Sequence, residues 1–323
     1  MTGADAMRPG RTFDRRDVAD WIAERGVYLG LVVLVLFNLV FTRRFGEFDN
    51  IRLQFVQVVP VAIIAVGMAL VIGTRGIDLS VGSVMAISSA LLANYLGYGP
   101  IVAVAVGLLG GVVVGLINGA LVAVVGVQPI VATLALLVGG RGLALVIAEG
   151  RLTEIFDPTL GALGSSRFFE VPVVCLIALG VALAVALLVS RTTFGRYVVA
   201  TGGSPRASLI AGIPVRRTLV ATYVLCALLA ALAGVIQTAR LGASDPSFVG
   251  NLIELSAITA VVVGGTPLSG GRVRIAGTLA GAMLMQLIGA TLISHNLPDS
   301  ATRMVMAILI VGAVFIQRQR TVQ

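Results

Sequence analysis

Long runs of apolar residues, separated by short polar segments, dominate the chain from residue 21 onward. A helix needs about 20 apolar residues to cross the roughly 30 Å hydrocarbon core of a bilayer. By this measure the pattern predicts ten membrane spans, at residues 21–41, 51–73, 80–97, 100–126, 129–148, 171–189, 218–240, 252–264, 275–293 and 301–317. The eighth run is short, so we expect it to reach only part of the way across.

Composition indicates an all-α polytopic membrane protein. The hydrophobic residues make up 58% of the 323 positions, the charged residues only 12%, and the mean hydropathy is +1.03. These values exclude an ordinary soluble domain. The two cysteines, Cys175 and Cys226, lie inside apolar runs, so a disulfide framework is not indicated.

The basic residues predict the orientation. The formal charge of +8 comes entirely from arginine, since the sequence contains no lysine. Arginines mark cytoplasmic loops of membrane proteins. We therefore expect the N-terminal segment 1–25, the loop 190–217 and the tail 318–323 to be cytoplasmic, and 26–317 to form the membrane domain. The acidic loop 149–170 then faces outward. No basic stripe is interleaved with aromatic residues, which argues against nucleic-acid binding.

Two polar interruptions of the apolar pattern resemble each other. They are GIDLSVGSV at 76–84 and GTPLSGGRV at 265–273, with matches at Gly76/Gly265, Leu79/Leu268, Ser80/Ser269, Gly82/Gly271 and Val84/Val273. Each follows one apolar run and precedes another. We interpret them as parts of two parallel pseudo-repeats, roughly spans 2–5 and 7–10, and paired broken segments of this kind indicate a transport pathway. Chance similarity between two turns rich in glycine and serine is the alternative.

The first interruption can be read physically. Asp78 or Ser80 is suited to accept hydrogen bonds from the free N–H groups that open the helix 80–97. Gly76 and Gly82 permit a sharp turn and close backbone contact. Backbone that leaves a helix at membrane depth must be buried in protein or line water. The segment is therefore either a capped turn at the interface or a broken helix beside a pathway.

The same residues carry a resemblance. GIDLSVGSVMAISSA (76–90) resembles the hallmark segment of the permease subunits of ribose-, xylose- and galactose-type ABC sugar importers, and the resemblance continues at 127–150, 194–217 and 254–273. The QPIVATL and GGRG pieces are most similar to the galactofuranose-type branch. The resemblance implies a multi-pass protein of the bacterial cytoplasmic (inner) membrane that imports a monosaccharide. It also implies a second permease chain, identical or related, two cytoplasmic ATP-binding subunits and an extracytoplasmic sugar-binding protein.

The chemistry available in the chain agrees with a transport subunit rather than an enzyme. A P-loop needs a lysine to reach the phosphates of ATP, so the absence of lysine means that ATP hydrolysis comes from a partner. The lone His295 offers neither a catalytic triad nor a metal cluster. We expect no cofactor, no metal and no catalytic residue. An ion-coupled secondary transporter is the alternative, although such proteins need ionisable groups in the membrane.

Polar residues within the spans are few. They include Asn94, Asn118, Thr133, Gln237, Ser256, Thr259 and Gln286. We therefore expect a passage that binds sugar weakly, with selectivity residing in a separate binding protein. A second feature is the glycine repeat Gly107, Gly111, Gly115 and Gly119, which predicts a helix face for close packing. A hinge is the alternative role for these glycines.

Arg141 and Glu254 are charged residues inside predicted spans. Arg141 lies in the outer half of the fifth span and Glu254 near the outer start of the eighth. A charge at such depth costs on the order of 3 kcal/mol unless it is paired. We predict an ion pair between them. The alternative is that Arg141 bonds backbone carbonyls and Glu254 reaches interfacial water.

The cytoplasmic loop 190–217 contains the signals of a short helix. Ser204 is a favourable N-cap before Pro205, Arg206–Ala211 can form the helix, and Gly212 suits the left-handed stop. So short a helix needs a surface to dock on. In the resembled family that surface is a groove on the ATPase, and the coupling residues here are Ser204, Arg206, Ala207, Gly212 and Ile213. The alternative is that the helix folds back on the permease itself.

Overall fold

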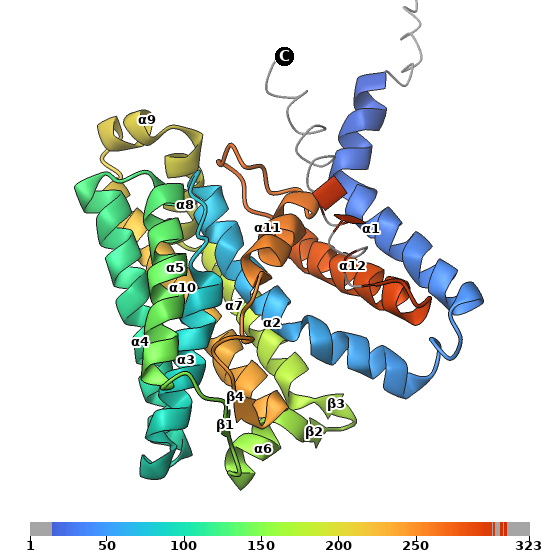
Figure 1. The fold of residues 1–323 in the computed structure, drawn as a ribbon. Coiled ribbons are helices and arrows are strands. Elements are labelled where there is room, and N and C mark those ends of the chain that lie inside the picture. The colour runs from blue at the N-terminus through green and yellow to red at the C-terminus, as the bar shows by residue number, and fades with distance from the viewer. Residues whose placement is uncertain (1–14, 299, 301–303, 306, 309–323) are drawn as a thin grey trace, which may run out of the picture.

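The computed structural model describes residues 15–298, 300, 304–305 and 307–308, with side chains from residue 26, and is mostly helical (Figure 1). The helices are α1 (Arg15–Phe41), α2 (Phe48–Gly73), α3 (Val81–Tyr95), α4 (Pro100–Ala120), α5 (Pro129–Ile147), α6 (Pro158–Ser165), α7 (Val173–Arg191), α8 (Thr193–Gly203), α9 (Pro205–Ile210), α10 (Val215–Leu241), α11 (Ile253–Val263) and α12 (Ile275–Ser294). A 3₁₀ turn, η1 (Leu96–Tyr98), extends α3, and a π-helical turn, η2 (Leu121–Val125), extends α4.

Seven helices of the described residues are long and apolar enough to cross a membrane. They correspond to the predicted spans 2–7 and 9, with ends that differ by a few residues. The first and eighth predicted spans coincide with shorter apolar helices, Gly26–Phe41 within α1 and Ile253–Val263. The tenth, 301–317, and the tail 318–323 lie almost entirely outside the described residues. In the segment 1–25, α1 already begins at Arg15.

The centre of the molecule is α2. It is buried almost without interruption from Val58 to Gly73, because its sequence is apolar on every face. It packs against α7, α8, α10, α11 and α12. In contrast, α4, α5 and α7 expose large aliphatic side chains such as Leu109, Val138 and Leu183. Such side chains are suited to contact lipid.

The glycine face of α4 is in close contact with its neighbours. Gly107, Gly111, Gly115 and Gly119 are all buried. A β-carbon at Gly107 would lie 3.0 Å from the carbonyl oxygen of Ser88 in α3, and one at Gly115 would lie 2.7 Å from Cα of Val224 in α10. Only glycine lets these backbones approach so closely.

The two ends of the bundle carry different connections (Figure 1). At one end lie α6 and two short antiparallel pairs, β1 (Thr153–Glu154) with β4 (Ala243–Ser244) and β2 (Arg167–Phe168) with β3 (Val171–Pro172). At the other end lie α8 and α9. The loop 149–170 and the loop 190–217 therefore stand at opposite ends, and both hold helices, α6 and α8, that the apolar pattern did not predict.

Candidate functional site

The chain breaks between α2 and α3, where the first polar interruption was predicted. Asp78 Oδ1 accepts hydrogen bonds from the backbone N–H of Ser80 at 2.9 Å and from its hydroxyl at 2.6 Å. Ser80 is the N-cap of α3, but its side chain bonds no N–H of that helix. Of the two predicted caps, Asp78 therefore accepts the N–H at the helix opening and Ser80 does not. The Ser80 hydroxyl instead accepts from Asn118 Nδ2 at 2.8 Å.

This break is enclosed in protein. Asp78, Ser80, Asn118 and Tyr223 have no exposed surface, and the atoms Asp78 Oδ2, Asn118 Oδ1 and Tyr223 Oη have no hydrogen-bond partner among the described residues. A β-carbon on Gly76 would lie 2.5 Å from Tyr223 Oη, so the position requires glycine. Burial in protein is what a backbone break at membrane depth requires. In this conformation, however, Asp78 and Ser80 do not face an open cavity.

The second break lies between α11 and α12. It runs from Gly264 to Arg274, four residues longer than the seven-residue break from Thr74 to Ser80. Gly265 and Gly271 adopt left-handed φ angles of 88° and 78°. Thr266 Oγ1 accepts from the N–H of Arg274 at 3.0 Å, which satisfies a donor at the start of α12. Ser269 is exposed.

The two breaks meet at the end of the molecule that carries α8. The N–H of Gly271 donates to the carbonyl oxygen of Gly73 at 3.0 Å. A β-carbon on Gly202, at the end of α8, would overlap that same carbonyl oxygen. Three backbone segments, 73–76, 202–203 and 269–271, therefore pack directly on one another, and we call this contact the glycine junction.

Arg141 and Glu254, predicted to pair, interact electrostatically but form no direct salt bridge. Arg141 Nη1 donates to the carbonyl oxygens of Pro246 at 2.8 Å and Val249 at 2.6 Å, and Nη2 donates to that of Gly250 at 3.1 Å. No salt bridge in the described part of the chain includes either residue. The loop before α11 presents three carbonyls to one guanidinium, so the hydrogen bonds of Arg141 go to the backbone.

Glu254 lies near the carbonyl groups that bind Arg141. It is 5% exposed, and its Oε2 has no hydrogen-bond partner among the described residues. A β-carbon on Gly82 would lie 2.6 Å from this oxygen and would overlap the carbonyl oxygen of Gly250. Gly82 therefore lets α3 approach the loop and α11, which is the close backbone contact expected of it, with partners that its place in the polar motif did not reveal.

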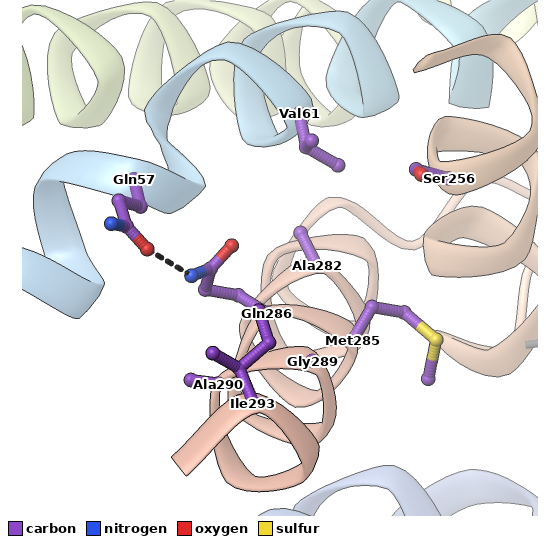
Figure 2. A pocket seen from close by; sticks show the side chains of 9 residues that line it. All are labelled: Gln57, Val61, Ser256, Ala282, Met285, Gln286, Gly289, Ala290 and Ile293. Carbon is purple, nitrogen blue, oxygen red and sulfur yellow. Dashed lines mark hydrogen bonds between the residues drawn. The ribbon is translucent and has the colours of Figure 1, made fainter. Parts of the chain in front are cut away.

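An amide-lined cavity opens between α2, α11 and α12 (Figure 2). Its volume is about 220 Å³, and its lining is Gln57, Val61, Ser256, Ala282, Met285, Gln286, Gly289, Ala290 and Ile293. Gln286 Nε2 donates to Gln57 Oε1 at 2.7 Å and to Gln54 Oε1 at 3.2 Å. Figure 2 shows the Gln57 and Gln286 side chains pointing toward each other at the cavity. Ser256 and Gln286 belong to the sparse polar residues noted in the spans, whereas Gln57 was not singled out.

The loop 190–217 forms the predicted short helix. The Ser204 hydroxyl accepts from the N–H of Ala207 at 3.3 Å, Pro205 begins α9, and Gly212 has a left-handed φ of 77°. Arg206 and Ala207 are exposed and Ile213 is half-buried. The apolar side chains of Leu209 and Ile210 are 60% and 82% exposed. The helix does not bury these residues on its own chain, contrary to the fold-back alternative.

The described residues offer no metal site. No group of three histidine, cysteine, aspartate or glutamate side chains gathers anywhere among them. His295 is exposed, and its Nε2 lies 3.3 Å from the hydroxyl of Thr42. The chemistry that the bundle can offer is hydrogen bonding from amides, hydroxyls and backbone groups.

Comparison with known proteins identifies relatives along most of the chain. A family described as the permease component of branched-chain amino acid transport systems matches residues 50–314. The ribose import permease protein of Bacillus subtilis is 39% identical over 300 residues, which cover 92% of this chain and 93% of the relative. The ribose import permease protein of Escherichia coli K12 is 37% identical over 307 residues, covering 93% and 95%.

A third relative is the galactofuranose transporter permease protein of Escherichia coli K12, 37% identical over 267 residues that cover 81% of this chain and 77% of the relative. No solved structure gives a significant match.

Proposed function

The chain belongs to the family of branched-chain amino acid transport system permease components, and we propose that it is the membrane-spanning permease of an ATP-binding cassette importer for a monosaccharide. The observation that carries this proposal is the similarity to ribose import permeases over nine-tenths of both chains. Fold class alone would not identify a substrate. The protein is a multi-pass protein of the bacterial cytoplasmic membrane.

The amide-lined cavity supports a sugar as the substrate. Gln57, Ser256 and Gln286 supply both donors and acceptors to a space otherwise lined by aliphatic groups. Sugar hydroxyls both donate and accept, and amides do the same. The cavity offers no aromatic face and no charge, so it is suited to weak, transient binding. Selectivity then lies in a separate extracytoplasmic binding protein.

The partners follow from what the chain lacks. Without lysine it has no usual P-loop, so cytoplasmic ATP-binding subunits must hydrolyse ATP. The exposed apolar side chains of α9, Leu209 and Ile210, support docking of those subunits at this helix. A second permease chain, identical or related, completes the membrane part.

We further propose ten spans in two pseudo-repeats, with both termini cytoplasmic. The resemblance between GIDLSVGSV, which follows α2, and GTPLSGGRV, which follows α11, supports the repeats. The helices α8 and α9, which belong to the arginine-rich loop 190–217, lie at the opposite end of the bundle from β1 and β4. This placement supports a cytoplasmic position for the α8–α9 end.

Uptake by vesicles that contain the complete importer tests the proposal. Radiolabelled D-ribose, D-galactose and L-leucine would be offered with and without ATP, in the presence and absence of a protonophore. We expect ATP-dependent uptake of a sugar, unaffected by the protonophore. Uptake of leucine alone would reassign the substrate. Uptake that collapses with the protonophore but ignores ATP depletion would support an ion-coupled transporter instead.

A further inference from the structure

Arg75 adopts a backbone conformation that favours glycine. It follows α2 with a left-handed φ of 69°. Its N–H donates to the carbonyl oxygen of Ile72 at 2.9 Å, and the N–H of Gly76 donates to the carbonyl oxygen of Val71 at 3.0 Å. A residue with a side chain is strained in this region. The arginine side chain must therefore offset a backbone cost that glycine would avoid.

The end of α11 shows the same turn with glycine in the same place. The N–H of Gly265 donates to the carbonyl oxygen of Val262 at 3.0 Å, and the N–H of Thr266 donates to that of Val261 at 3.1 Å. The φ of Gly265 is 88°. By hydrogen-bond pattern, Arg75 occupies the position of Gly265. The first break thus carries an arginine where the second uses the residue that the backbone favours.

The Arg75 side chain bridges the other two segments of the glycine junction. Its Nε donates to the carbonyl oxygen of Ser269 at 2.8 Å, and its Nη2 donates to that of Gly203 at 2.5 Å. The planar guanidinium presents these two donors in a fixed relation that a lysine ammonium does not reproduce. One side chain therefore fixes the loop before α12 and the end of α8 to the end of α2.

The three segments lead directly to the functional elements. Gly203 immediately precedes Ser204, which caps α9. Arg75 is three residues before Asp78 of the first break, and Ser269 lies within the second. We propose that Arg75 is a positioning residue that links α8 and α9 to both broken helices, so that a displacement of α9 shifts both breaks together. This inference rests on the proposed function, because it takes α9 as the contact with the ATPase.

The test measures sugar molecules transported per ATP hydrolysed by the complete importer in proteoliposomes. For Arg75→Ala we expect this ratio to fall about tenfold, since two charge-assisted hydrogen bonds are lost. Arg75→Lys should restore only part of it. Arg43→Ala is the matched control, an exposed arginine in the connection between α1 and α2, and should keep the wild-type ratio. A merely stabilising role would lower the amount of importer and leave the ratio unchanged.

A covalent replacement for the bridge gives the second measurement. Gly203→Cys and Ser269→Cys are tolerable, because a β-carbon at 203 meets nothing within 4 Å and Ser269 is exposed. A short bifunctional thiol reagent should join these cysteines and restore the ratio in the Arg75→Ala background. A wild-type ratio in Arg75→Ala, or no recovery after complete cross-linking, would overturn the inference. No sugar uptake by the wild type would instead overturn the proposed function.

Discussion

Replacing Asp78 distinguishes the two things that its carboxylate provides, an acceptor and a charge. Asp78→Ala removes the acceptor of two hydrogen bonds from Ser80, at 2.9 and 2.6 Å. Asp78→Asn keeps a carbonyl oxygen of the same shape in the same place and removes only the ionisable group. Because Asp78 has no exposed surface, water cannot replace what either variant loses.

The burial raises the expected cost of Asp78→Ala. A lost cap at an exposed helix start costs about 1 kcal/mol. Here the Ser80 N–H is left without its acceptor inside the bundle, and a buried unsatisfied group costs about 1–3 kcal/mol. We therefore expect Asp78→Ala to destabilise the protein by about 3 kcal/mol. Asp78→Asn should cost under about 1 kcal/mol, since an ionised carboxylate without a cationic partner is itself unfavourable in the interior.

Thermal unfolding of the purified permease in one detergent, with membrane levels and uptake measured in parallel, gives the comparison. We expect Asp78→Ala to unfold at a lower temperature and to lose uptake, and Asp78→Asn to remain close to the wild type in both. Equal damage by the two variants would show that the charge, not the acceptor, is needed. Wild-type stability of Asp78→Ala would contradict the hydrogen bonds described for this break.

Three further predictions address other parts of the chain. Gly115→Ala should destabilise the protein by about 2 kcal/mol through overpacking, because its β-carbon would lie 2.9 Å from Cβ of Ala227. Gly139→Ala is the control and should be neutral, because its β-carbon would meet nothing within 4 Å. Equal unfolding temperatures of the two variants would argue against close packing of α4. Arg141→Ala should speed hydrogen exchange in the loop 245–251 and cost about 3 kcal/mol, more than Glu254→Gln. Unchanged exchange in this loop would contradict the contacts between Arg141 and its carbonyls. Ala207→Trp should leave the permease inserted but unable to couple to ATP hydrolysis, and a cysteine from Ala207→Cys should cross-link to the ATPase; full uptake without a cross-link would refute the docking of α9.

Much of the fold could be predicted from short-range patterns in the sequence. A span is an uninterrupted apolar run of fixed minimum length, so nine of the runs could be placed within a few residues of the helices that the structure describes. The helix α9 was predictable for the same reason, because Ser204, Pro205 and Gly212 each act within one turn of their own position.

Contacts between distant segments were not predictable. The carbonyls that hold Arg141 belong to Pro246, Val249 and Gly250, and no backbone acceptor is visible in a sequence. Charge alone suggested Glu254 as the partner, whereas the hydrogen bonds of Arg141 go to backbone carbonyls. The tight contact of Gly202 with Gly73 was missed for a similar reason, since close approach depends on how α8 is oriented, not on the spacing of its residues.

The relation between the two breaks depends on which property is aligned. Residue identity pairs Gly76 with Gly265, whereas the hydrogen bonds that end α2 and α11 pair Arg75 with Gly265. Each break has a Leu-Ser pair after its left-handed residue, at 79–80 in the first break and at 268–269 in the second. The spacing from Gly265 to its pair is one residue shorter than the spacing from Arg75 to its pair. Backbone hydrogen bonds are the better guide, because they define the turn itself. With the turn aligned, the left-handed position of the first break holds an arginine that reaches across to the other break and to α8. Because Arg75 joins the two breaks to the end of α8, we expect a displacement of α9 to shift both breaks together.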